Sequence, residues 1–288
     1  MEKLKIDESS LNECVYCHSF CKSKCPSFEI SGNECFLPKN ISYLYFLLKK
    51  GDIDLSGQLA EIFYSCVNCS LCEISCIYEN KDFLSNIVKI RNEVYKNKPG
   101  VLPNEILKII NNIKNENNIF GEETSALDVD SNYFVKKSEN LLLPGCYVNY
   151  KVPEYFDGVG NFLNKIGYDY KISDNGKCCG APLYYAGDID SARIFAQELK
   201  KEVVDNNIKK IISLCPSGYN FIKNEYEKLG VDLSVDIVFY TELMDSFLKD
   251  KYTKRDNRSN MKVLFLEPGD FGGGSEITKS VKNLLNDS

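Results

Sequence analysis

Eight of the 13 cysteines in this 288-residue chain form two runs of four, spaced Cys-x2-Cys-x3-Cys-x3-Cys-Pro and Cys-x2-Cys-x2-Cys-x3-Cys. Three thiolates on one short loop can reach three irons of a cubane, and in two-cluster ferredoxins the fourth cysteine of each run ligates the other cluster. The spacing therefore predicts two 4Fe-4S clusters with crossed ligands. One cluster is expected on Cys14, Cys17, Cys21 and Cys76, and the other on Cys66, Cys69, Cys72 and Cys25.

Zinc is the alternative that these spacings leave open, because paired cysteine knuckles also suit tetrahedral zinc. Zinc knuckles use two close cysteines per pair, whereas two runs of four are typical of iron-sulfur clusters. His18 lies inside the first run and is expected to be a bystander, since four thiolates already complete that site. Cys35 has no partner at cluster spacing and is expected to be a lone buried thiol.

A second constellation consists of Cys146, Cys178, Cys179 and Cys215. Cys146 and Cys215 follow predicted strands, and the adjacent pair lies in the loop after another. Because the carboxyl ends of parallel strands form one crevice, we expect the four thiols to converge. Adjacent unligated thiols near solvent would be prone to oxidation, so an iron-sulfur cluster is the leading interpretation. Zinc and four unligated buried thiols remain as alternatives.

The elements around these cysteines indicate a multidomain chain. Up to residue 100, cysteine loops alternate with short helices, predicted over 41–48, after a cap at Asp54 or Ser56, and over 83–96. A helix from Pro103 and a polar stretch make 101–139 a helix and linker. Residues 140–255 alternate apolar runs with amphipathic helices, among them 153–166 and 189–204, which predicts an α/β domain with a parallel sheet. The expected strands are 140–143, 168–172, 210–214, 236–240 and 262–266.

Composition restricts the class of protein. The 35 basic and 41 acidic residues are spread without a basic stripe, so we expect no nucleic-acid partner. No apolar stretch approaches the roughly 18 residues of a membrane span. The polar N-terminus lacks the apolar segment of a secretion signal. We therefore expect a cytoplasmic protein, membrane-associated only through a partner.

The stretch from Cys14 to Cys76 resembles the α-helical ferredoxin domain of iron-sulfur subunits. Such subunits occur in heterodisulfide reductase, glycolate oxidase and anaerobic glycerol-3-phosphate dehydrogenase. The order of cysteine loop, helix, turn, helix and second cysteine loop matches. Two departures are an extra residue between Cys17 and Cys21 and Ile77 in place of the usual proline, and neither removes a ligand.

The later cysteines resemble the CCG motif of the same families, which reads Cys, then Cys-Cys-Gly, then Cys-x2-Cys. In heterodisulfide reductase-like proteins this motif holds a noncubane 4Fe-4S cluster. Here Gly218 stands in place of the last cysteine. A second copy of the motif, expected to begin near residue 266, has Leu-Glu-Pro-Gly instead of His-Asp-Pro-Cys. We therefore interpret 256–288 as a remnant half-domain, and its glycine run at 272–274 as a loop rather than a phosphate site.

The resemblance implies an electron-transfer subunit of an anaerobic oxidoreductase, relaying electrons through two clusters to or from the CCG site. The expected partner is a redox protein such as a flavin-containing dehydrogenase or a cytochrome subunit. No catalytic acid, base or nucleophile is predicted. The alternatives are a thiol/disulfide reductase of the heterodisulfide type acting at the CCG site, and a non-redox assembly or regulatory protein that keeps clusters structurally.

Overall fold

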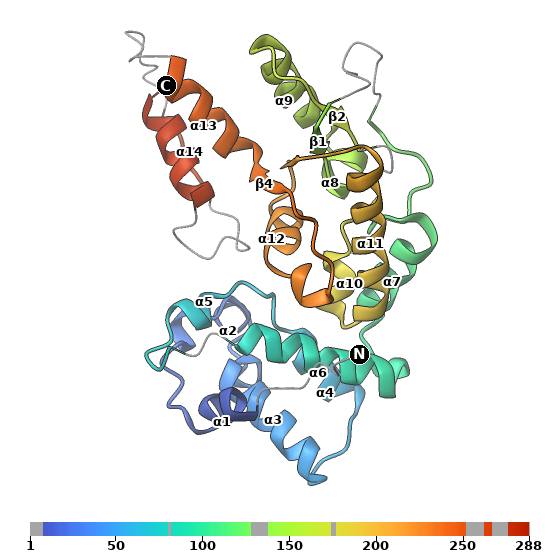
Figure 1. The fold of residues 1–288 in the computed structure, drawn as a ribbon. Helices are drawn as coiled ribbons and strands as arrows, with labels where there is room; N and C mark the ends of the chain where they lie inside the picture. The colour runs from blue at the N-terminus through green and yellow to red at the C-terminus, as the bar shows by residue number, and fades with distance from the viewer. Residues whose placement is uncertain are drawn as a thin grey trace. The chain divides into compact units, whose positions relative to one another are not determined.

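The structure is a computed structural model that describes residues 8–79, 82–127, 138–173, 177–251, 262–266 and 276–287. It divides into two compact units, whose elements are labelled in Figure 1. The N-terminal unit comprises residues 1–111 together with 182–189. The C-terminal unit comprises residues 112–181 together with 190–288.

The N-terminal unit is helical, as predicted. Its helices are α1 (Glu8–Tyr16), α2 (Pro26–Ser31), α3 (Pro38–Lys50), α4 (Gly57–Tyr64), α5 (Leu71–Ile74) and α6 (Phe83–Asn97), with 3-10 turns η1 (Lys22–Lys24), η2 (Glu34–Phe36) and η3 (Pro99–Val101). Helix α7 (Asn104–Glu116) follows. The Ser56 side chain caps α4 by accepting a hydrogen bond from Leu59 N at 3.2 Å. Buried Ile41, Phe63 and Ile87 belong to the core that holds the cysteine loops in place.

Residues 182–189 pack within the N-terminal unit although they follow the CCG sequence directly. The Tyr64 hydroxyl donates to Ala186 O at 2.6 Å, and the Asn92 amide donates to Gly187 O at 2.5 Å. Gly187 has φ +94°, and a Cβ there would lie 2.5 Å from the Arg91 carbonyl carbon and oxygen. This close approach to α6 therefore requires glycine. The segment includes most of α10 (Ala181–Ala186).

The C-terminal unit is built on a four-stranded parallel sheet of order β2-β1-β3-β4, which confirms the predicted α/β class. The strands are β1 (Asn140–Leu143), β2 (Lys171–Ile172), β3 (Lys210–Ser213) and β4 (Asp236–Phe239). The helices are α8 (Cys146–Tyr150), α9 (Pro153–Lys165), α11 (Ile189–Asp205), α12 (Pro216–Asn224), α13 (Tyr240–Lys251) and α14 (Glu276–Asp287), with the 3-10 turn η5 (Glu227–Leu229). Strand residues Leu142 and Ile212 share one buried cluster with Phe156 and Leu163 of α9. This packing fixes the turns that follow β1 and β3.

The prediction of a strand over 262–266 is wrong. The structure has no strand there, and the side chains of Val263, Leu264 and Leu266 are each more than half exposed. An apolar run forms a strand only where a neighbouring strand accepts its hydrogen bonds, and sequence alone does not show that neighbour. The Leu-Glu-Pro-Gly element, apart from its leucine, and the glycine run at 272–274 lie outside the described residues.

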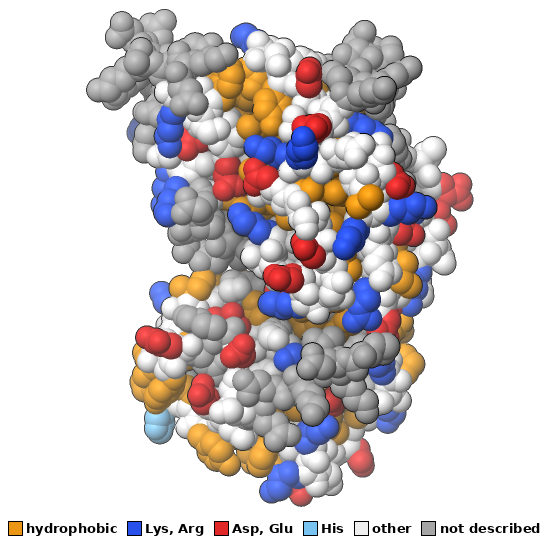
Figure 2. Space-filling model, viewed as in Figure 1, with side chains coloured by type: hydrophobic (Ala, Val, Ile, Leu, Met, Phe, Trp, Pro, Cys, Tyr) orange, Lys and Arg blue, Asp and Glu red, His pale blue; other side chains and the backbone are white. Residues whose placement is uncertain are grey.

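On the face shown in Figure 2, basic and acidic side chains are interspersed, and neither sign of charge forms a continuous patch. This distribution agrees with the absence of a basic stripe in the sequence. Among the helices of the described residues, none has the length and apolar character needed to cross a membrane.

Candidate cluster-binding sites

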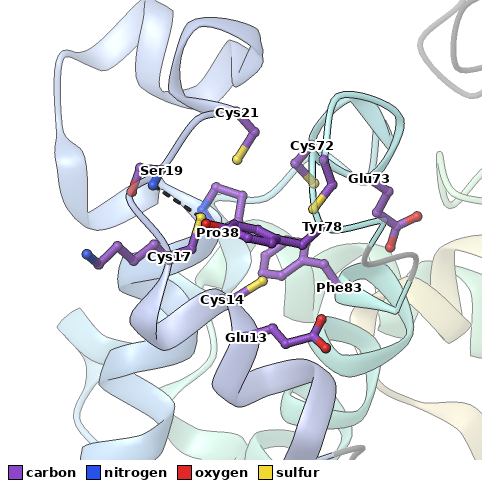
Figure 3. Close-up of a pocket in the computed structure, with 12 residues that line it drawn as sticks. Glu13, Cys14, Cys17, Ser19, Cys21, Pro38, Cys72, Glu73, Tyr78 and Phe83 are labelled. Atoms are coloured by element: carbon purple, nitrogen blue, oxygen red, sulfur yellow. Dashed lines mark hydrogen bonds between the residues drawn. The ribbon is translucent and has the colours of Figure 1, made fainter.

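The first cysteine loop faces a pocket in the N-terminal unit. Cys14 lies near the end of α1, and Ser19, at φ +60°, bends the loop back so that its N–H reaches Cys17 Sγ at 3.3 Å. Figure 3 shows the sulfurs of Cys14, Cys17 and Cys21 directed toward the pocket. The second cysteine loop completes its lining with Cys72 and Cys76.

Electrostatic coupling identifies the neighbours within this first set. Burial, together with the nearby thiols of Cys21, Cys76 and Cys17, raises the pKa of Cys14 to about 12. Burial also raises the pKa of Cys21, with Cys17 as the next cause. Like charges gathered in a desolvated pocket disfavour the thiolate form, and a bound metal reverses this effect. Cys14, Cys17, Cys21 and Cys76 are therefore mutual neighbours.

The second set draws on the other loop in the same way. Asn68 (φ +56°) and Ser70 (φ +58°) bend the chain between Cys66 and Cys72. Burial raises the pKa of Cys66, and the Cys69 and Cys25 thiols add to the shift. Burial likewise raises the pKa of Cys72, and Cys66 contributes the most among the neighbouring thiols.

Cys25 reaches the second set from the start of α2, where it precedes Pro26. Its thiol donates to Phe36 O at 3.8 Å. Cys72 also couples to Cys21, so the two sets are adjacent. Cys76 thus lies near Cys14 and Cys21, and Cys25 lies near both Cys66 and Cys21.

The donor chemistry fits iron-sulfur clusters. The Ser42 hydroxyl is buried and has no hydrogen-bond partner within the described part of the chain. It lies beside Cys14, where it favours the thiolate form and so lowers the pKa of that thiol. A metal-bound thiolate at Cys14 would therefore supply the acceptor that Ser42 lacks. No group of three or more Cys, His, Asp or Glu side chains in the described residues lies as close together as a single metal ion requires.

His18 and Cys35 lie apart from these sets. His18 does not line the pocket, and its ring stands edge-on to Phe20 with centroids 6.2 Å apart. Cys35 is exposed, so the expectation of a buried thiol is wrong. It lies in the short surface turn η2, which is too brief to present an inward face.

The CCG cysteines lie at the carboxyl ends of the strands. Gly145, between β1 and Cys146, has φ +81°, and a Cβ there would lie 2.7 Å from Cys215 Cβ. Glycine at this position allows the turn after β1 to approach the turn after β3. Buried Cys178 is anchored by its N–H, which donates to Asn117 O at 2.8 Å.

The four CCG thiols are close enough to affect one another. A hydrogen bond with Cys178 lowers the pKa of Cys146, and the same bond, with one to Cys179 and burial, raises the pKa of Cys178. Cys215 Sγ accepts a hydrogen bond from Gly218 N at 3.4 Å. Cys146, Cys178 and Cys179 are therefore neighbours, and Cys215 and Cys179 both lie beside position 218.

Gly218 occupies the place of the absent fifth thiol. It lies in the first turn of α12 with an ordinary φ. A Cβ added there would lie 3.6 Å from both Cys179 Sγ and Cys215 Sγ, and 3.4 Å from Cys215 Cβ. A side chain at position 218 would therefore point at the other cysteines without backbone strain.

Two contributors near the clusters were missed by sequence reasoning. Ser42 gives no local signal, since serine occurs throughout the chain. Arg91 donates to Cys66 O at 2.6 Å. The sequence does contain a signal for Arg91. It lies on the buried face of α6 among Ile87, Ile90 and Val94, where a charged residue is unexpected.

The fold and the two cysteine sites define an iron-sulfur protein with a separate cysteine-rich domain. Residues 10–80 match the 4Fe-4S dicluster domain, and residues 141–223 match the cysteine-rich domain. The chain therefore carries both domains, as the resemblance predicted.

Three curated relatives are similar over most of the chain. An uncharacterized iron-sulfur protein of Methanocaldococcus jannaschii is 22% identical, and a fumarate reductase (CoM/CoB) subunit of Methanothermobacter marburgensis is 24% identical; each match covers 97% of this chain and 56% of the relative. The EtfAB:quinone oxidoreductase of Syntrophomonas wolfei is 25% identical, covering 78% of this chain and 33% of the relative. The chain thus spans about half the length of the first two relatives. No solved structure matches it.

Proposed function

We propose that this chain is an iron-sulfur electron-transfer subunit of an anaerobic oxidoreductase. The observation that supports the proposal is that thiols of the two cysteine loops lie close together: Cys76 acts on Cys14, and Cys25 acts on Cys66. These couplings agree with a crossed assignment, three thiols from one loop and one from the other, which is the ligand pattern of two-cluster ferredoxins. Relatives named as oxidoreductases or their subunits support the same class.

The first cluster is assigned to Cys14, Cys17, Cys21 and Cys76, and the second to Cys25, Cys66, Cys69 and Cys72. A bound 4Fe-4S cluster supplies one-electron transfer. The protein's part is to hold and shield it. The Ser19 N–H donates to a ligand sulfur, and Pro38 and Phe83 line the first pocket with apolar surface. Such contacts set the potential at which each site accepts an electron.

The partner is a redox protein such as a flavin-containing dehydrogenase or a cytochrome subunit. Exposed apolar side chains near the first pocket support docking of a protein: Tyr16, Phe20, Ile77 and Tyr78. In Figure 2 apolar side chains lie near the single histidine on the same part of the surface. The protein is assigned to the cytoplasm, with membrane association through this partner.

The CCG site is proposed to hold a third metal group through Cys146, Cys178, Cys179 and Cys215. Four thiolates are the number that a closed cubane or a tetrahedral zinc site uses. With glycine at position 218, no fifth thiolate is available to bridge irons. The site is therefore proposed to be coordinatively closed and to take part in electron relay rather than in disulfide chemistry.

A thiol/disulfide reductase is the second candidate function. The lowered pKa of Cys146 beside the Cys178 thiol favours it, because a thiolate is the nucleophile of thiol-disulfide exchange. The two functions can be separated by adding a disulfide to protein that has been reduced with dithionite. Reoxidation of the protein by the disulfide supports the reductase, whereas no reoxidation supports the electron carrier.

The crossed ligands can be tested with one variant and a matched control. Cys25→Ser should damage the cluster of Cys66, Cys69 and Cys72, although it lies in the other loop. Cys35→Ser removes an exposed thiol from the same region and should leave both clusters intact. Iron analysis and electron paramagnetic resonance (EPR) of the reduced proteins measure the outcome. Loss of the cluster held by Cys14, Cys17 and Cys21 in Cys25→Ser would refute the assignment.

A further inference from the structure

Arg91 is a buried cation beside the second cysteine loop. Only 3% of the residue is exposed. Its guanidinium donates to Phe63 O (2.9 Å), Cys66 O (2.6 Å), Asn68 Oδ1 (3.2 Å) and Tyr185 O (2.8 Å). The Tyr64 ring lies over it, 5.0 Å from Cζ to the ring centroid. Every one of these partners belongs to the N-terminal unit.

The hydrogen-bond partners of Arg91 are all uncharged. Three are backbone carbonyls and one is a side-chain amide, and no carboxylate of the described residues pairs with the guanidinium. A buried charge without an opposite charge is strongly destabilising. Arg91 donates to the carbonyl of Cys66, and the thiolate form of Cys66 favours the charged guanidinium and is itself favoured by it.

We infer that Arg91 is the built-in counter-ion of the second cluster and holds its reduction potential above that of the first cluster. This inference rests on the proposed function, because it requires clusters on both cysteine sets. Reduction adds one negative charge to a cluster, and a nearby fixed cation favours that charge. The first electron to enter the protein therefore resides on the cluster of Cys25, Cys66, Cys69 and Cys72.

Other charges near the clusters do not provide the same bias. Glu73 couples to Cys72 and also lines the first pocket, so its negative charge acts on both sites. Glu13 and Lys39 line the first pocket, Glu13 exposed and Lys39 half-buried, where water screens their charges. Arg91 is shielded from water, and at low dielectric its field on the adjacent site is stronger. The asymmetry between the two clusters therefore follows from Arg91.

Two variants remove the net charge in different ways. Arg91→Gln deletes the cation. Asn68→Asp keeps Arg91 and its hydrogen bond but supplies the missing carboxylate in nearly the same shape, at a left-handed position that aspartate tolerates. Both should lower the potential of the second cluster. Because Asn68 Oδ1 also lies 4.0 Å from Cys66 Sγ, a carboxylate there acts on the site directly as well, so the contrast between Arg91→Gln and Arg91→Lys separates the charge of Arg91 from a structural role. Arg91→Lys retains the charge and should retain most of the potential.

The experiment is an EPR-monitored redox titration of the whole purified protein. The two signals are assigned with Cys69→Ser, and the control is Arg193→Gln, which removes an arginine that also donates to a backbone carbonyl, that of Leu229. The measured quantity is the occupancy of the second cluster by the added electron divided by that of the first cluster. We expect this ratio to fall at least tenfold in Asn68→Asp. The same fall is expected in Arg91→Gln where that variant assembles both clusters. Tenfold corresponds to about 59 mV for one electron. Arg193→Gln should change nothing.

The outcomes separate the two claims. Two intact clusters with an unchanged occupancy ratio in Asn68→Asp would overturn the role of Arg91, even if Arg91→Gln fails to fold. A wild-type potential of the second cluster below that of the first would overturn it as well. Wild-type protein without iron would instead refute the proposed function.

Discussion

Gly218 decides what chemistry the CCG site can perform, and two substitutions at this position test the closed-site reasoning. Because φ is ordinary and a Cβ would meet neighbouring atoms at 3.4–3.6 Å, Gly218→Ala should fold normally. Replacing glycine by alanine in a helix stabilises it by about 0.5–1 kcal/mol. For a chain of this size that raises the unfolding midpoint of the metal-free protein by roughly 1–4 °C. Calorimetry of reduced, metal-free protein measures the shift.

Gly218→Cys adds a thiol to the same Cβ, directed at Cys179 and Cys215. We expect it to match the alanine variant in stability when metal-free and reduced. In the metal-loaded state only the cysteine variant gains a fifth ligand, so only it should change the metal content or spectrum of the site and acquire disulfide reduction. Disulfide reduction by the unmodified protein, at a rate that Gly218→Cys does not increase, would contradict the closed-site reasoning. A melting point for Gly218→Ala well below wild type would contradict the geometry.

Two further predictions concern the N-terminal clusters. Ser42→Ala should lower the reduction potential of the first cluster without loss of iron, because it removes the hydroxyl that would donate to the metal-bound thiolate of Cys14. A redox titration measures the potential, and an unchanged value would count against this contact. Cluster reconstitution should improve as pH rises. Burial raises the pKa of Cys14 and Cys72, and these protonated thiols must lose protons to bind metal. Iron uptake that is equal at pH 7 and pH 9 would argue against these buried thiols as ligands.

The helical and parallel-sheet elements were largely predictable because their patterns are local. The run at 83–96 predicted α6 within one residue, and the alternation after residue 140 predicted the strand-helix order. Cysteine spacing likewise predicted that thiols of the two loops lie close together, because short loops restrict which sulfurs can meet; the crossed assignment itself stays a prediction. The predicted strand 168–172 was too long: only Lys171–Ile172 pairs with β1.

Features that depend on contacts far apart in the sequence were not predictable. The hydrogen bond from Tyr64 to Ala186 spans 122 residues, and nothing local in 182–189 indicates packing in the N-terminal unit. The prediction of a strand at 262–266 was wrong for the same reason, since a strand forms only where a neighbouring strand pairs with it. Arg91 was detectable as an anomaly on an apolar helix face, but its role needed the positions of Cys66, Asn68 and Tyr185.

The central claim is that eight N-terminal cysteines hold two four-iron clusters. The most direct measurement is the metal content and visible spectrum of anaerobically purified full-length protein carrying Cys178→Ala and Cys179→Ala, which removes the contribution of the CCG site. The crossed-ligand assignment predicts about eight irons per chain with the brown absorption of iron-sulfur clusters. Stoichiometric zinc without that absorption would contradict it.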